Sequence, residues 1–129
     1  MTEQAETYDG SCHCGAIRFR FKGKPITGAM RCNCSICRRK NALMSRAYYP
    51  PADFELLSGA DDLVVYRFEP NMVNHYFCQH CGIYPFHDAV EDPELGYRVN
   101  LGCVEAIEDP HALPVRVFDG RDTWKYLAC

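Results

Sequence analysis

The sequence predicts a mainly β protein that is assembled from short antiparallel strands and held together by bound metal. Short runs of β-branched and aromatic residues are separated by glycine and proline, which is typical of strands and turns. No segment has the apolar spacing of a long amphipathic helix. Nine cysteines are present, and most of them stand in tight clusters that suit metal ligation.

The length of 129 residues is enough for a single domain, which we expect at residues 10–129. Residues 1–9 are polar, and we expect them to form a flexible N-terminal segment. The clearest strand is residues 16–22, because Ile17, Phe19 and Phe21 alternate with charged residues and so define one buried face.

The other elements follow the same signals. Ser35 is expected to cap a short helical turn that ends at Arg39. Strands from residue 54 to residue 78 are expected to form a meander with a turn at 69–71, and the last strand is expected at a sheet edge. The strands that follow the first are expected at residues 42–49, 54–57, 63–68, 73–78, 83–86, 97–103 and 115–118.

The charge of the chain argues against nucleic acid as a partner. Its formal net charge is −3, its pI is about 5.9, and its longest basic run is Arg38-Arg39-Lys40. Acidic residues stand near the N-terminus where a signal peptide has bases, and no stretch is long enough to span a bilayer. We therefore expect a cytoplasmic protein without a membrane partner.

The cysteines favour metal over disulfides, because their number is odd, no export signal is seen and their spacing is clustered. Cys32, Cys34 and Cys37 are close enough in sequence to occupy three corners of one zinc tetrahedron. A fourth corner that stays open to water or substrate indicates chemistry. The alternative is a second structural site that is closed by Cys103, Cys129 or a histidine.

Two further cysteine pairs each need two more ligands. The simplest assignment joins Cys12 and Cys14 with Cys78 and Cys81 in one closed, structural tetrathiolate site. Zinc binding of this kind supplies on the order of 10 kcal/mol of apparent folding free energy. The alternative is that Cys78 and Cys81 are merely small buried residues.

The two remaining cysteines and His75 are expected to have roles other than metal binding. Cys103 shares strand parity with Val99 and Leu101, and we expect it in the core. Cys129 is terminal and is expected to be a free thiol. His75 is expected to be a packed, hydrogen-bonded histidine and not a metal ligand.

With these residues in view, the chain resembles the glutathione-dependent formaldehyde-activating enzyme (GFA) family, which is also known for the centromere protein V (CENP-V) domain. The resemblance covers residues 10–119 and rests on several motifs in one order. They are Gly10-Ser11-Cys12-His13-Cys14-Gly15, Cys32-Asn33-Cys34-Ser35-Ile36-Cys37-Arg38, Leu56-Leu57-Ser58-Gly59, Tyr76-Phe77-Cys78-Gln79-His80-Cys81-Gly82-Ile83 and Val99-Asn100-Leu101-Gly102-Cys103.

Carried over to the matching positions, the resemblance implies a β-tent (Mss-like) fold, a structural zinc on the two outer cysteine pairs, and a second, labile zinc on Cys32, Cys34 and Cys37. It also implies an enzyme that joins glutathione to formaldehyde as S-(hydroxymethyl)glutathione, with these three cysteines as the catalytic ligands. The partners would then be glutathione or a similar thiol and a small aldehyde. The alternative is a non-catalytic carrier of glutathione or metal, or an interaction module.

The residues themselves suggest how such a reaction runs. A thiol bound at the open corner has a lowered pKa, and its addition to an aldehyde gives a hemithioacetal. The reverse reaction cleaves a carbon–sulfur bond, so the enzyme would be a carbon–sulfur lyase or synthase. Arg38 and Arg39 are expected to hold the carboxylates of the thiol in bidentate pairs, and the alternative is that they form a solvated basic turn.

Overall fold

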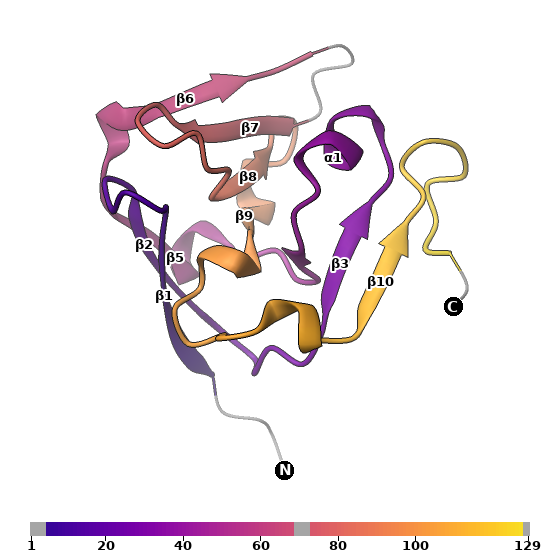
Figure 1. Ribbon diagram of the computed structural model, residues 1–129, viewed down its shortest axis with the longest axis horizontal. Coiled ribbons are helices and arrows are strands. Elements are labelled where there is room, and N and C mark those ends of the chain that lie inside the picture. The colour runs from indigo at the N-terminus through magenta and orange to yellow at the C-terminus, as the bar shows by residue number, and fades with distance from the viewer. Residues whose placement is uncertain (1–4, 69–72, 128–129) are drawn as a thin grey trace.

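The computed structural model describes residues 5–68 and 73–127, and it is mainly β with short strands, as the sequence predicts. The strands form three small sheets around a shared core, with one short helix beside them (Figure 1). The expected turn at 69–71 and the expected free thiol of Cys129 lie outside the described residues.

Sheet A contains β1 (Glu6–Ser11), β2 (Arg18–Gly23) and β5 (Phe54–Ser58), paired antiparallel in the order β1-β2-β5. The predicted alternation in β2 is confirmed, because Phe19 and Phe21 are buried between exposed charged residues. Residues 6–9, expected to be flexible, instead belong to β1. Their backbone pairs with β2 and the Tyr8 ring stacks on Phe21, so this segment has the contacts that order it.

Sheet C is an antiparallel meander of β6 (Leu63–Tyr66), β7 (Val73–Cys78), β8 (Phe86–Ala89) and β9 (Tyr97–Val99). The expected meander is wrong at its start, because β5 pairs with β2 and not with β6. The strand predicted at residues 83–86 is displaced, because β8 begins only at Phe86. β9 stops at Val99 because residues 101–103 turn into a 3-10 helix.

Sheet B contains β10 (Val115–Phe118), β3 (Ala29–Cys32) and β4 (Met44–Ser45) in the order β10-β3-β4. β10 is an edge strand, as expected, but it pairs parallel with β3, a strand that the sequence analysis did not predict. The expected strand at 42–49 contracts to the two residues of β4 plus isolated bridges. The helix α1 (Ser35–Lys40) follows β3, and its N-cap is Cys34.

The main core lies between sheets A and C, and 3-10 helices occur in several of the connections between strands. Phe19 stacks on Phe54 at 5.6 Å between ring centres and meets Phe86 edge-on at 5.3 Å. Each such buried ring contributes about 1.5–3 kcal/mol. The 3-10 helices are η1 (Pro51–Asp53), η2 (Ala60–Asp62), η3 (Pro93–Leu95), η4 (Leu101–Cys103) and η5 (Pro110–Ala112).

None of the helices in the described part of the chain has the length and apolarity that a membrane span requires, since α1 has only six residues.

Candidate metal centre

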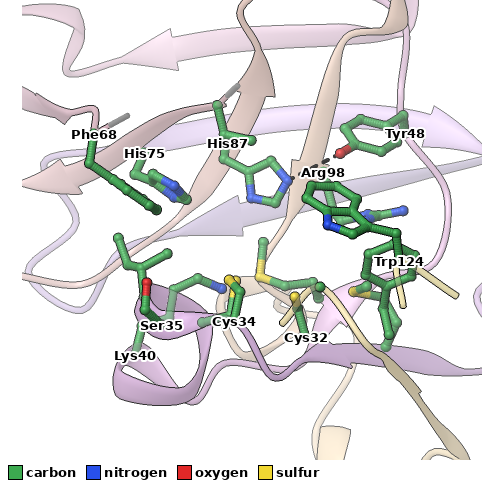
Figure 2. A pocket seen from close by; sticks show the side chains of 17 residues that line it. Cys32, Cys34, Ser35, Lys40, Tyr48, Phe68, His75, His87, Arg98 and Trp124 are labelled. Atoms are coloured by element: carbon green, nitrogen blue, oxygen red, sulfur yellow. Dashed lines mark hydrogen bonds between the residues drawn. The ribbon is translucent and has the colours of Figure 1, made fainter. Parts of the chain in front are cut away.

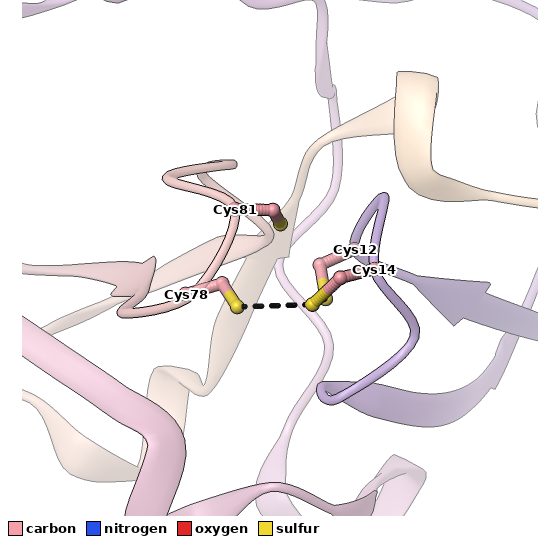
Figure 3. Close-up of side chains that lie close together, drawn as sticks. All are labelled: Cys12, Cys14, Cys78 and Cys81. Carbon is pink, nitrogen blue, oxygen red and sulfur yellow. Dashed lines mark hydrogen bonds between the residues drawn. The ribbon is translucent and has the colours of Figure 1, made fainter.

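Four sulfur atoms from two sheets converge at one point (Figure 3). Cys12 and Cys14 lie between β1 and β2, Cys78 ends β7 and Cys81 lies in the turn that follows. Their Sγ atoms all lie within 4.8 Å of one another, with 3.7 Å from Cys12 to Cys14 and 3.6 Å from Cys14 to Cys78. A tetrahedral site with Zn–S bonds of about 2.3 Å places its sulfurs about 3.8 Å apart. This four-cysteine cluster therefore fits a closed zinc site.

Backbone hydrogen bonds hold these sulfurs in place. The Ile17 amide donates to Cys12 Sγ at 3.3 Å, a contact that stabilises a thiolate. The Gly82 amide donates to the Cys78 carbonyl at 2.9 Å and closes the second turn. Gly82 has a φ of 75°, which glycine adopts without steric cost. The turn therefore brings Cys78 and Cys81 close together through its own backbone.

The second group is the three-cysteine cluster of Cys32, Cys34 and Cys37. Cys32 ends β3, Cys34 is the N-cap of α1 and Cys37 lies within α1. Their Sγ atoms lie within 4.8 Å of one another, and in residues 5–68 and 73–127 no histidine, carboxylate or fourth cysteine joins them. Cys103 is packed in the main core instead. Three sulfur donors fit a zinc ion and leave one tetrahedral corner without a ligand from the described residues.

The three thiols of this cluster compete for protons. Hydrogen bonds from Cys32 and Cys37 lower the pKa of the Cys34 thiol to about 2. The hydrogen bonds of Cys37 with Cys32 and Cys34 raise the pKa of Cys37. One thiolate therefore forms readily, whereas a second is opposed by like charge. A cation among the three sulfurs removes that repulsion, which is why the cluster suits a metal.

The loop after β10 covers one side of the three-cysteine cluster. A Cβ atom on Gly120 would stand 2.6 Å from Cys32 Sγ, so only glycine fits against this sulfur. The neighbouring Asp119 is buried and its carboxylate accepts hydrogen bonds from the Asn33 amide and the Thr123 hydroxyl, both at 2.9 Å. These bonds lower the pKa of Asp119 and fix the loop beside the sulfurs.

A cavity of about 280 Å³ opens beside the three-cysteine cluster, between α1, sheet B and sheet C (Figure 2). All three cysteines line it, so a ligand in this space would lie beside the cluster. The size suits a small organic ligand. The apolar lining consists of Met30, Ile36, Met44, Phe68, Val73, Phe118 and Trp124.

Two cations line the cavity, and they differ from Arg38 and Arg39, whose expected contact with the carboxylates of a thiol stays a prediction. Lys40 and Arg98 line the cavity, whereas Arg38 and Arg39 are exposed and lie outside its lining. The reason for the difference is helical spacing, because Cys37 and Lys40 are three residues apart and share the inward face of α1. The two arginines between them point away from that face.

Arg98 lacks an acidic partner within the described residues. Its Cζ lies 4.2 Å from the centre of the Tyr48 ring, and its Nη2 donates to the Arg46 carbonyl at 3.1 Å. Its Nε is buried, with no hydrogen-bond acceptor in the described part of the chain. A buried donor without a partner costs about 1–3 kcal/mol. The guanidinium group of Arg98 nevertheless lines the cavity and brings a positive charge to its wall.

Two buried histidines form the wall opposite the sulfurs. His75 and His87 line the cavity, and each is hydrogen-bonded to the hydroxyl of Tyr84. The prediction of a packed, hydrogen-bonded His75 is confirmed. Sequence reasoning missed His87 and Arg98, which face each other on β8 and β9. A correct register for these two strands is the only signal that would have brought them together.

Comparisons with known proteins identify the family of this chain and a solved structure with a similar fold. The family model described as glutathione-dependent formaldehyde-activating enzyme matches residues 7–118. A Halomonas elongata protein, named as a candidate glutathione-dependent formaldehyde-activating enzyme, is 30% identical over 114 residues, which cover 72% of this chain and 73% of that protein. The crystal structure of a Rhodobacter sphaeroides protein has a TM-score of 0.71 and 33% identity, and covers 83% of this chain and 98% of that chain.

We expect Asp119→Asn to loosen the loop at the three-cysteine cluster, because an amide cannot accept all the hydrogen bonds that the carboxylate receives. Unfolding followed by the fluorescence of Trp124, the single tryptophan, should show a Tm lower by about 5 °C. Asp122→Asn is the matched control, because the exposed side chain of Asp122 makes only a long ion pair with Arg121 among the described residues, and the substitution keeps the backbone amide that donates to Asp119. Equal Tm values for the two variants would contradict the role of Asp119.

Proposed function

The chain belongs to the glutathione-dependent formaldehyde-activating enzyme family, and from that premise we propose that it forms and cleaves the carbon–sulfur bond between a glutathione-like thiol and a small aldehyde such as formaldehyde. The observation that carries the proposal is the opening of the three-cysteine cluster onto a cavity with Lys40 and Arg98 in its wall. A purely structural cluster has no need of such a cavity.

Zinc is the cofactor that suits both clusters. The four-cysteine cluster would hold one ion for architecture, and Cys32, Cys34 and Cys37 would hold the second. When bound at the second site, zinc would lower the pKa of an added thiol and so ease the loss of its proton to a base in the cavity. The chain itself then has to bind the rest of the thiol, hold the aldehyde and move one proton.

Binding of the thiol falls to the cavity cations. A glutathione-like thiol carries carboxylates, and the guanidinium group of Arg98 in the cavity wall would offer one of them charge-assisted hydrogen bonds. Lys40 adds a second positive charge from the inner face of α1. Burial lowers the pKa of Lys40, and a bound carboxylate would favour its charged form. The apolar walls exclude water from the remaining volume and suit a small carbonyl compound.

The reaction needs no oxidant or reductant. In the forward direction a sulfur lone pair forms the bond to the carbonyl carbon, the π electrons of the carbonyl move to oxygen, and the thiol proton is transferred to that oxygen. Cleavage reverses each change. Formation and cleavage therefore require a base near sulfur and an acid near oxygen in the same cavity.

Metal content gives the first test. Zinc-loaded protein should contain two zinc ions per chain, and Cys34→Ser should contain about one while keeping its fold. Cys78→Ser should lose the structural ion and unfold at a much lower temperature. Elemental analysis and thermal unfolding measure both, with the core variant Cys103→Ala as the control that retains two ions. Retention of two ions by Cys34→Ser would contradict the assignment of the second site.

Activity is tested by exchange NMR with glutathione and formaldehyde. The zinc-loaded protein should accelerate formation and breakdown of the adduct at least about tenfold over the uncatalysed exchange, and Cys34→Ser should abolish this acceleration. Absence of acceleration by the intact protein would remove the formaldehyde reaction. Glutathione binding in calorimetry without acceleration would instead favour the non-catalytic carrier or module.

The role of the cavity arginine is tested by Arg98→Gln, which removes the charge at the cavity wall. Glutathione binding to the zinc-loaded protein should weaken about tenfold to 100-fold, the range expected for a hydrogen bond to a charged group. Calorimetry measures the change, and Arg39→Gln serves for comparison because Arg39 is exposed outside the cavity. Weaker binding by Arg39→Gln with normal binding by Arg98→Gln would restore the assignment made from sequence.

A further inference from the structure

Two histidines and one tyrosine form a continuous hydrogen-bonded chain in the cavity wall. The Tyr84 hydroxyl lies 2.6 Å from His75 Nδ1 and 2.9 Å from His87 Nδ1. All three side chains are buried, and both imidazole rings line the cavity. Figure 2 shows His75 and His87 on the side of the cavity opposite Cys32 and Cys34.

The geometry fixes how many hydrogens the hydrogen-bonded row of His75, Tyr84 and His87 can hold at its two contacts. A tyrosine hydroxyl has one hydrogen to donate, so it can donate to only one of the two Nδ1 atoms. The other Nδ1 must carry a hydrogen itself and donate to the Tyr84 oxygen, because two lone pairs at this distance would repel. When both rings are neutral, His75 and His87 therefore have opposite tautomers.

Both rings are neutral near pH 7. Burial, with help from the charge of Lys40, lowers the pKa of His75 to about 4. Burial also lowers the pKa of His87 well below its usual value, and the charges of Lys40 and Arg98 act in the same direction. The charged rings that would allow two Nδ1–H donors are thus disfavoured.

The consequence appears at the other nitrogen of each ring. The ring with hydrogen on Nδ1 has a free lone pair on Nε2, and the ring without it has an Nε2–H group. His87 Nε2 lies 3.5 Å from the hydroxyl of half-buried Tyr48 at the cavity (Figure 2). His75 Nε2 has no hydrogen-bond partner within residues 5–68 and 73–127. One base and one acid are therefore always paired in the same wall.

We infer that His75 and His87 are the catalytic base and acid of the proposed carbon–sulfur reaction, and that Tyr84 is the positioning residue that couples them. This inference rests on the proposed function. As the carbon–sulfur bond forms, one Nε2 takes the thiol proton and the Nε2–H of the other ring protonates the carbonyl oxygen. The first ring passes its Nδ1 proton to Tyr84, which passes its own proton to the second ring.

The transfer leaves His75, His87 and Tyr84 neutral, and each histidine ends with the tautomer that the other had before. No ring has to become a buried cation at the end of the step, which is the advantage of coupling through Tyr84. Cleavage of the adduct runs the same transfers backwards and restores the first arrangement. After net formation, exchange of protons with water in the cavity restores it as well.

The test uses the zinc-loaded full chain with ¹⁵N-labelled histidine. Long-range ¹H–¹⁵N spectra should assign a neutral Nδ1–H tautomer to one of His75 and His87 and a neutral Nε2–H tautomer to the other. In the Tyr84→Phe variant, the tautomer of one histidine should no longer depend on the tautomer of the other. The variant's rate of adduct exchange should fall about 100-fold, with glutathione binding within twofold of the intact protein.

Tyr76→Phe is the matched control, because it removes a hydroxyl on β7 that contacts Asp88 and does not line the cavity. This control should retain both the rate and the tautomers. If Tyr84→Phe does not fold, the rate of the intact protein in H₂O–D₂O mixtures decides the question. A curved dependence on the deuterium fraction is expected for several protons in transfer, and a linear or absent dependence would overturn the coupling.

The possible failures are distinguishable. An intact protein without any acceleration would remove the proposed function, and the catalytic role of the histidines with it. An active protein whose Tyr84→Phe variant keeps the full rate would overturn the coupling while the proposed function stands. Identical tautomers or charged rings at both positions would contradict the claim that His75 and His87 are neutral with opposite tautomers, whatever the activity.

Discussion

The meeting of four sulfur atoms at the junction of sheets A and C is the constraint on which the rest of the fold depends. Cys14 and Cys78 are 64 positions apart in the chain, yet their sulfurs lie 3.6 Å from each other. The aromatic core of Phe19, Phe54 and Phe86 lies between the same two sheets. A metal at this junction would contribute on the order of 10 kcal/mol, comparable with the whole net stability of a small domain.

With sheets A and C joined, the cavity follows from where sheet B and α1 are placed against them. Sheet B and α1 supply the sulfurs, and sheet C supplies the histidines and Arg98 on the opposite side. Lys40 lies on α1 beside the sulfurs and Arg98 lies on the opposite side, so two cations share one apolar enclosure. Cations in such an enclosure attract a bound anion more strongly than they would at an exposed site.

The sequence predicts those features that depend only on residues close to one another in the chain. The grouping of cysteines into clusters and the buried face of β2 are examples, since each depends on neighbours in sequence. β3 escaped prediction because its strongest partner is β10, which lies near the other end of the chain. The position of Lys40 in the cavity wall depends on the helical phase that it shares with Cys37, which the count of basic residues at 38–40 does not specify. His87 and Arg98 meet only through the register of two strands, which composition does not specify.

The parallel pairing of β10 with β3 also sets an order on biosynthesis. A ribosome releases the chain from its N-terminus, so all four sulfurs of the sheet A–C junction have emerged once Cys81 is out. The three-cysteine cluster emerges earlier still, but the strand and loop that flank it, with Gly120 against Cys32, are synthesised after all four sulfurs of that junction. The four-cysteine cluster can thus assemble while the three-cysteine cluster still lacks its cover, so the cavity is completed only when β10 and the loop after it have emerged.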